Sequence, residues 1–243
     1  MQFGALGDIH GDFASVRRIM RRHPGLTFWV SVGDLAGKEG QYEAVEAPLY
    51  WIKGNNENFD LIAAGSFPDN LHYLPAARPA QISGVLIAGL GGTLAPTWYE
   101  TAAADLPYPN MPGSKVRTPG AGGAPRAAAV RDDKRRHFVR DEVEACKALR
   151  GIELFMTHEA PRPYNVGGRG GGRGLDAGKT PINEILAEMQ PRLHLFGHHH
   201  RYTDQVRQGV RSVGLDLVSR SYLLVDADTF EFTMHDSRSD HVP

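Results

Sequence analysis

Short apolar segments of this sequence are repeatedly followed by side chains that can bind a cation or transfer a proton. Each segment reads as a buried strand, and the polar groups come where the chain would leave the sheet. In open α/β folds ligands bind at the carboxyl ends of strands, so we expect these groups to converge on one site. The carboxylates, the amide and the imidazoles concerned are Asp8, His10, Asp34, Asn55, His158, His198, His199 and His200.

These groups are of the types that divalent cations bind, with oxygen supplied by Asp and Asn and nitrogen by His. These groups are too many for one tetrahedral zinc ion, but they suit two adjacent cations that share one carboxylate. A pair roughly 3.5–4 Å apart is the usual arrangement for hydrolysis of phosphate esters. The sequence therefore predicts a site for two divalent metal ions, with Mn²⁺ expected first and iron or Zn²⁺ as alternatives.

Each residue taken alone allows a plainer interpretation. Asp is common in turns after strands, Asn55 could form an Asx-turn, and the three histidines at 198–200 could lie in a solvated loop. The joint pattern, in which five strands each end in such a group, favours the metal site.

Alternating strand-like and helix-like segments would position this site. Residues 13–23 have helical periodicity with Asp12 as a candidate N-cap, and further helices are expected at 138–151 and after Pro181. Strands are expected at 2–6, 26–32, 47–53, 85–92, 152–157 and 192–196, and in a tail at 203–207, 210–214, 221–226 and 230–235. This order predicts a single α/β domain over residues 1–243 that contains more than one sheet.

Two stretches interrupt this order. Residues 101–136 are rich in Ala, Gly and Pro and have almost no large aliphatic side chains, which predicts a long loop or a partly disordered insertion. A glycine run at 167–174 predicts a flexible loop that carries Arg169 and Arg173.

The bulk composition is that of an ordinary globular protein. The chain has 243 residues, 41% hydrophobic content and a formal net charge of −1, which argues against a general polyanion binder but allows a local basic patch. Its one cysteine, Cys146, cannot form an internal disulfide and suits a reducing compartment. With no signal peptide and no apolar run near the roughly 18 residues that span a bilayer, we expect a cytoplasmic protein without membrane contact. The sequence does not fix the oligomeric state.

The motifs "GDIHG", "GDL", "GNNE", "THE" and "GHHH", in this order over residues 7–200, resemble the five blocks of the calcineurin-like metallophosphoesterase superfamily. The resemblance implies an α/β fold built as a four-layer αββα sandwich, in which two mostly mixed β-sheets are flanked by helices. It also implies hydrolysis of phosphoester bonds at a binuclear metal centre.

Carried over position by position, the resemblance gives each group a role. Asp34 would bridge the two metals, and His199 falls at a position that the family leaves free. The ligands of the first metal would be Asp8, His10 and His200, and those of the second would be Asn55, His158 and His198.

Position 56 departs from the family pattern, because Asn56 stands where family members usually have a histidine that helps to protonate the leaving oxygen. An asparagine can donate a hydrogen bond to a phosphoryl oxygen but cannot deliver a proton, and general acid catalysis is worth ~10²–10⁴-fold in rate. Family branches without this histidine often act as phosphodiesterases, so we expect a preference for phosphodiesters or activated substrates. The alternative is that another group supplies the proton. Glu57 is expected to position its neighbours by hydrogen bonds rather than to bind metal.

The expected mechanism is attack on phosphorus by a hydroxide that bridges the two metals near Asp34, while the cations neutralise charge on the equatorial oxygens. Asp34, Asn56 and His10 are therefore the expected catalytic residues.

Around the insertion the sequence also distantly resembles the lariat debranching enzyme branch. "GLGG", an insertion, "RRHF" and "THEAPRP" follow one another in a similar order, which implies a branched RNA substrate. Two departures argue against that substrate: this branch usually has a cysteine where Asp8 stands, and it keeps the histidine that is absent at position 56.

Asn56, Arg162 and Arg169 are the expected substrate contacts, because an amide N–H could bind a phosphoryl oxygen and guanidinium groups near the metals could hold the phosphates of a nucleotide or of RNA. The alternative is a solvated basic surface. Other readings of the function are a phosphomonoesterase, a debranching-like RNA-processing nuclease and a non-catalytic scaffold. Further basic residues that could contribute are Lys134, Arg135, Arg136 and Arg173.

Overall fold

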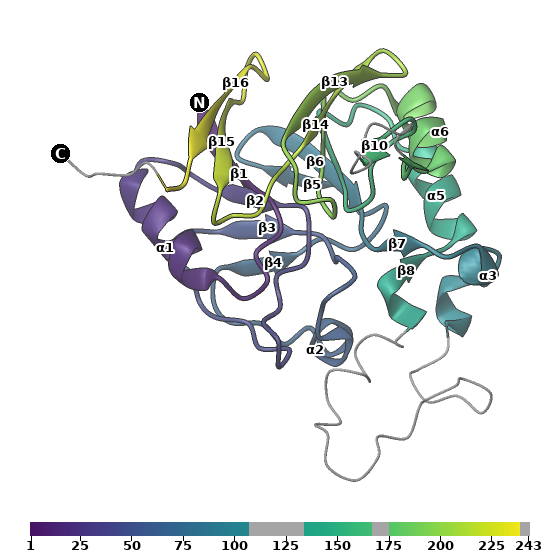
Figure 1. The fold of residues 1–243 in the computed structure, drawn as a ribbon, viewed down its shortest axis with the longest axis horizontal. Coiled ribbons are helices and arrows are strands. Elements are labelled where there is room, and N and C mark those ends of the chain that lie inside the picture. The colour runs from purple at the N-terminus through teal and green to yellow at the C-terminus, as the bar shows by residue number, and fades with distance from the viewer. Residues whose placement is uncertain (107–133, 167–174, 239–243) are drawn as a thin grey trace, which may run out of the picture.

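The computed structural model describes residues 1–106, 134–166 and 175–238. Two six-stranded β-sheets face each other, and helices cover their outer faces (Figure 1). This arrangement confirms the predicted α/β fold with four αββα layers and two mixed sheets.

The first sheet is built around the N-terminal strand. In spatial order its strands are β16 (Phe232–Asp236), β15 (Ser221–Asp226), β1 (Gln2–Leu6), β2 (Trp29–Ser31), β3 (Leu49–Trp51) and β4 (Leu71–Tyr73). Strands β1 to β4 are parallel, whereas β15 runs antiparallel to both β1 and β16. The carboxyl ends of β1, β2 and β3 therefore lie at one edge of this sheet.

The second sheet has the same mixed character. In spatial order its strands are β13 (Thr203–Arg207), β14 (Val210–Gly214), β12 (Leu193–Phe196), β9 (Leu154–Thr157), β6 (Val85–Leu90) and β5 (Ala80–Ile82). The four central strands are parallel, and the edge strands β13 and β5 are antiparallel to their neighbours. Strands β9 and β12 are adjacent, so the loops that follow them leave the sheet side by side.

Alternation along the strands divides the apolar side chains between two faces. In residues 28–32, Phe28, Val30 and Val32 point into the core between the sheets, whereas Trp29 belongs to the core on the helix side. This is the period of two expected of a strand. Because both faces are buried, these strands read in the sequence as nearly continuous apolar runs.

Helix α1 (Phe13–Arg22) covers the outer face of the first sheet. Val16 and Ile19 are fully buried on its inner side, one helical turn apart. The Asp12 carboxylate accepts a hydrogen bond from the Ser15 backbone N–H at 3.1 Å, which confirms the predicted N-cap. The cap ends the loop that carries the first motif.

Helices α5 (Arg140–Lys147) and α6 (Thr180–Met189) cover the second sheet. Val143 and Ile185 share a buried cluster with Phe155 of β9. Helix α6 begins slightly earlier than predicted, because proline is compatible with the first turn of a helix.

Several short elements are absent from the sequence prediction, and some predicted strands are shorter in the structure. β2 and β3 each contain three residues, because their outer ends continue as loops without ladder pairing. The unpredicted elements include β4, β5, α2 (Phe59–Ala64), α3 (Pro96–Tyr99), β7 (Thr93–Leu94), β8 (His137–Phe138), β10 (Asn165–Val166) and β11 (Leu175–Asp176).

Most of the expected insertion at 101–136, and the glycine run at 167–174, lie outside the described residues. At the two described ends of the insertion the chain forms short 3₁₀ turns, Ala103–Asp105 and Lys134–Arg136. β8 follows the second turn and pairs in parallel with β7. The described segments thus tie the end of the insertion back to the strand exit at residue 93.

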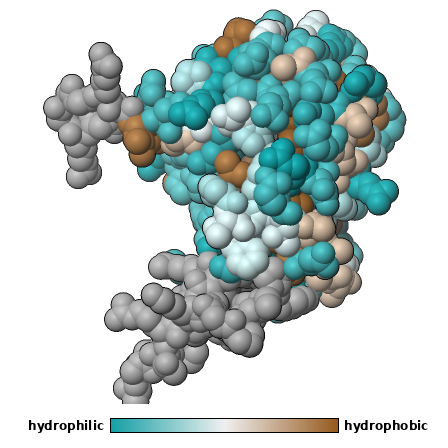
Figure 2. Space-filling view, turned by 90° about the vertical axis from the view of Figure 1, so that its right-hand side faces the viewer, coloured by the Kyte–Doolittle hydropathy of each residue, from teal (hydrophilic) through white to brown (hydrophobic). Residues whose placement is uncertain are grey.

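Large hydrophobic side chains are scattered on the described surface. On the face drawn in Figure 2 they form small, separate patches among hydrophilic residues, as is ordinary for protein surfaces. Within the described ranges, no helix is long and apolar enough to cross a membrane. The exposed large hydrophobic residues found there are Met1, Leu175, Val206 and Met234.

Candidate metal centre

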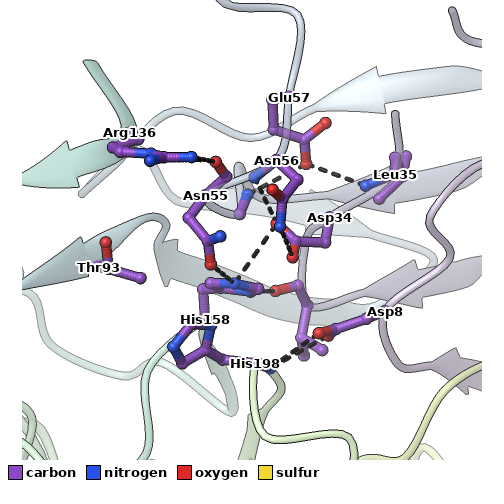
Figure 3. Close-up of polar contacts among 12 residues, drawn as sticks. Asp8, Asp34, Leu35, Asn55, Asn56, Glu57, Thr93, Arg136, His158 and His198 are labelled. Atoms are coloured by element: carbon purple, nitrogen blue, oxygen red, sulfur yellow. Dashed lines mark hydrogen bonds and ion pairs between the residues drawn. The ribbon is translucent and has the colours of Figure 1, made fainter. Parts of the chain in front are cut away.

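The predicted ligands lie on loops that follow strands of both sheets: β1, β2 and β3 of the first and β9 and β12 of the second. Several contacts join these loops across the sheets, and two of them involve the backbone. The backbone N–H of His198 donates to Asp8 Oδ2 at 3.0 Å, and His158 Nδ1 lies 2.8 Å from the carbonyl oxygen of Val32. The two sets of strand exits therefore meet at one place (Figure 3).

Asp8, His10, Asp34 and His200 form the first group of candidate ligands. Each offers one ligand atom, and these atoms lie within 4.8 Å of one another. His200 Nε2 lies 3.1 Å from His10 Nε2 and 3.0 Å from Asp8 Oδ2. A cation with ligands at about 2.1 Å in octahedral geometry holds neighbouring donors about 3.0 Å apart, so the spacing fits a divalent metal ion.

Asn55, His158 and His198 form the second group. Because a carbonyl oxygen can only accept, His158 Nδ1 donates its proton to Val32, and Nε2 is the ring atom left to bind a metal ion. This Nε2 atom lies 2.9 Å from Asn55 Oδ1 and 3.5 Å from Asp34 Oδ1. An imidazole nitrogen and two oxygens that converge in this way are ligand types that divalent cations accept, so this group also fits a cation.

The Asp34 carboxylate lies between the two groups. Its Oδ2 is 3.6 Å from His10 Nε2, and its Oδ1 is 3.5 Å from His158 Nε2. Asn56 fixes this orientation, because its backbone N–H donates to Oδ1 and its side-chain amide donates to Oδ2, both at 2.7 Å. Burial raises the pKa of Asp34, but the His158 charge and the Asn56 hydrogen bonds lower it by more, and the group stays ionised.

Three histidines of the site, His158, His198 and His200, have shifted pKa values, and the shifts do not all have the same direction. Burial lowers the pKa of His158, but the charges of Asp34 and Asp8 raise it by more. A hydrogen bond with Asp8 raises the pKa of His200. Burial lowers the pKa of His198 to about 3, so its ring is neutral near pH 7 and offers a lone pair. A neutral imidazole is the form that binds metal.

Four candidate ligands have a left-handed backbone conformation. The angle φ is 48° at His10, 53° at Asp34, 70° at His198 and 50° at His200. Residues other than glycine rarely adopt this region, and such strain persists where surrounding contacts hold it. The turns that aim these ligands at a common centre therefore depend on the contacts around them.

Glycine precedes the ligands where the loops approach each other most closely. A Cβ atom on Gly54 would overlap the Asp34 carboxylate, and one on Gly197 would overlap the Asp8 carboxylate. The glycines of "GN" and "GH" therefore leave the space in which a carboxylate from another loop lies.

Glu57 joins the loops that follow β2 and β3. Its buried carboxylate accepts from the backbone N–H groups of Leu35 and Gly54 through Oε1, at 3.0 and 3.1 Å. Through Oε2 it accepts from the Ala36 N–H at 3.2 Å and the Tyr42 hydroxyl at 2.9 Å. Burial raises its pKa to about 7, although these donors oppose the shift. Glu57 thus contacts the loops by hydrogen bonds, in keeping with its predicted positioning role.

Of the predicted substrate contacts, Asn56 contacts Asp34 directly, whereas Arg162 forms an ion pair with Asp176. Arg162 Nε donates to Asp176 Oδ2 at 2.6 Å, and the Arg162 side chain is 56% exposed. Arg169 lies outside the described residues. His199 stacks on the buried ring of Tyr164, with ring centroids 4.5 Å apart. Binding of substrate by the two arginines stays a prediction.

Three contacts near the site have no counterpart in the sequence prediction. The Arg136 guanidinium donates to the backbone carbonyl of Asn55, and Tyr42 supports Glu57. The Lys179 ammonium lies 3.8 Å from Glu159, which is buried directly after the fourth ligand loop. Of these residues, only Glu159 could have been singled out from the sequence, because its carboxylate directly follows the predicted ligand His158.

Residues 1–202 match the calcineurin-like phosphoesterase family. The chain belongs to this family. It is therefore a metal-dependent phosphoesterase, and its cluster of Asp and His side chains can hold metal ions. No curated protein sequence matches the chain.

Solved structures share this fold at low sequence identity. One superposes with a TM-score of 0.65 at 12% identity and covers 97% of this chain and 98% of its own. TT1561 of Thermus thermophilus superposes with a TM-score of 0.60 at 13% identity, covering 98% of this chain and 99% of its own. GAP50, the anchor in the inner membrane complex of Plasmodium, gives 0.53 at 10% identity over 100% of this chain and 86% of its own. At such identities the likeness concerns the fold alone.

Glu57→Gln should destabilise the metal-free protein by about 1–3 kcal/mol, because the new amide NH₂ would face N–H or O–H donors that now meet a carboxylate oxygen. Chemical denaturation with EDTA present measures the change. Glu39→Gln, at an exposed position of the same loop, is the control and should leave the stability unchanged. Equal stabilities of the two variants would contradict the role given to Glu57.

Proposed function

We propose that this metallophosphoesterase is a phosphodiesterase that acts at a pair of divalent cations. The observation that carries the proposal is the orientation of Asp34, whose Oδ2 faces His10 at 3.6 Å while its Oδ1 faces His158 at 3.5 Å. A carboxylate with one oxygen toward each of two donor groups supports a ligand shared by two cations.

Family resemblance and geometry support the same two ligand sets. When bound, the cations would supply Lewis-acid stabilisation of the phosphoryl group and lower the pKa of a water molecule. The mixed oxygen and nitrogen donors accept Mn²⁺, and also iron or Zn²⁺. Besides the shared Asp34, one set comprises Asp8, His10 and His200, and the other comprises Asn55, His158 and His198.

Asn56 has two tasks in this proposal. One N–H of its side-chain amide holds Asp34 Oδ2 at 2.7 Å. The amide nitrogen carries a second N–H, which can bind a phosphoryl oxygen of the substrate. His10, with 33% of its side chain exposed, is the ligand that would lie beside the bound phosphate.

The residue type at position 56 supports the diester class. An amide cannot release a proton, so Asn56 cannot act as the general acid for the leaving oxygen. A leaving group that departs readily as an anion loses least from this absence. Phosphodiesters and activated esters of good leaving groups are therefore the proposed substrates.

A nucleotide or another biological phosphodiester fits this class, with Arg162 and Arg169 as proposed contacts for further phosphates. The reaction is assigned to one domain of residues 1–243 with an insertion at about 101–136. A substrate panel of cyclic nucleotides, dinucleoside polyphosphates, and branched and linear RNA, assayed with Mn²⁺, would show which phosphodiester or phosphoanhydride is cleaved. Cleavage confined to branched RNA would favour the debranching-like branch.

Asp34→Asn should reduce Mn²⁺-dependent hydrolysis of a chromogenic diester by more than about 100-fold, the upper end of what outer partners of a metal site cost. The neutral amide removes the charge and one acceptor from the ligand that both groups share. Steady-state rates with and without EDTA measure the effect. Asp69→Asn, at an exposed position, is the matched control, and full metal-dependent activity in Asp34→Asn would refute the assignment.

The wild-type protein should hydrolyse bis(4-nitrophenyl) phosphate with a higher kcat/KM than 4-nitrophenyl phosphate, which has the same leaving group. Asn56→His should narrow this preference, because an imidazole can return a general acid worth ~10²–10⁴-fold. Parallel kcat/KM measurements on the two esters provide the test. A strong monoester preference in the wild type would count against the diester proposal.

A further inference from the structure

The peptide group between Asn55 and Asn56 is held from two opposite sides. Its carbonyl oxygen accepts from Nη2 and Nε of Arg136, at 2.5 and 3.2 Å. Its N–H donates to Asp34 Oδ1 at 2.7 Å. In a planar trans peptide the C=O and N–H point in opposite directions, so the two contacts form one chain (Figure 3). The single peptide group thus links a guanidinium cation on one side to a buried carboxylate on the other.

Lys53 holds the backbone around Arg136 in place beside this peptide group. Its ammonium donates to the backbone carbonyls of Arg135 and His137, at 2.8 and 3.2 Å, which lie on either side of Arg136 in the chain. The backbone N–H of Gly92 donates to the carbonyl of Lys53 at 2.7 Å. The segment that carries Arg136 is therefore fixed to the end of β3, two residues before Asn55.

The chain of contacts bears on both candidate ligand groups. A charged donor makes a stronger hydrogen bond than a neutral one, and it polarises the peptide whose N–H then binds the carboxylate more firmly. Asp34 lies between the two groups. Asn55, whose carbonyl Arg136 binds, also carries the side-chain Oδ1 that lies 2.9 Å from His158 Nε2. A change in the orientation of this peptide would move Asn55 and release Asp34.

We propose that Arg136 is a positioning residue of the metal centre. It acts through the Asn55–Asn56 peptide group to hold the Asn55 and Asp34 side chains in place relative to each other. The inference rests on the proposed function, because it takes these two residues as metal ligands. It gives Arg136 a different task from the phosphate contact expected from the sequence.

Arg135 provides a matched comparison. Its guanidinium donates to the Phe59 carbonyl at 3.2 Å and to Asp60 Oδ1 at 2.9 Å, so it also anchors the 134–138 segment. These contacts reach α2 rather than the Asn55–Asn56 peptide. Loss of Arg135 therefore tests the anchoring of the segment, whereas loss of Arg136 tests the contact with the peptide.

The experiment is titration of the metal-free full chain with Mn²⁺ by isothermal calorimetry, in the wild type, Arg136→Gln and Arg135→Gln. The wild type should bind two equivalents. Arg136→Gln should weaken binding of at least one equivalent by about 10–100-fold, the effect typical of partners that orient metal ligands. Arg135→Gln should bind as the wild type does, and circular dichroism in EDTA should give the same fold for all three proteins.

Equal affinities of the wild type and Arg136→Gln would overturn the proposal while leaving the binuclear site intact. An equal loss in Arg135→Gln and Arg136→Gln would overturn it too, because anchoring of the segment would then explain the effect. If Arg136→Gln does not fold, Arg136→Lys and Arg135→Lys are compared instead: weaker binding in the former supports the proposal, and equal binding overturns it. A wild type that binds no Mn²⁺ would overturn the proposed function itself.

Discussion

The Asp34 carboxylate is a buried anion on which the rest of the site depends. Burial of a charge costs several kcal/mol unless partners compensate for it, and here the neighbouring imidazoles and two hydrogen bonds from Asn56 do so. Because each carboxylate oxygen faces a different group of donors, the same residue defines where both groups meet. Loops that follow strands of two separate sheets must therefore come close to this one carboxylate.

The fold brings these exits together with short, crowded loops. Gly54 and Gly197 leave room for carboxylates from other loops, and several ligands accept a left-handed backbone. The surrounding polar residues then hold these strained loop conformations in place. Glu57 ties together the loops after β2 and β3, and Arg136 closes the chain of contacts on the outer side of the Asn55–Asn56 peptide. The candidate centre is thus a property of contacts between loops more than of any single motif.

The layered fold was predictable because buried strands and amphipathic helices leave strong periodic patterns, as residues 28–32 and α1 illustrate. The candidate ligands were recognisable because their types are unusual directly after apolar strands. Contacts such as that of Arg136 with Asn55, which lie 81 residues apart in the chain, leave no local pattern. The contact of Tyr42 with Glu57 could not be predicted for the same reason, because Tyr42 lies in a loop without regular structure. Helix α2 escaped prediction because its six residues are too few to establish a period.

The most direct test of a carboxylate shared by two cations is anomalous diffraction from crystals of the protein grown with Mn²⁺. The account predicts two anomalous peaks, about 3.5–4 Å apart, on either side of Asp34. One peak should lie among Asp8, His10 and His200 and the other among Asn55, His158 and His198. A single peak, or peaks in contact with only one of the Asp34 oxygens, would contradict it.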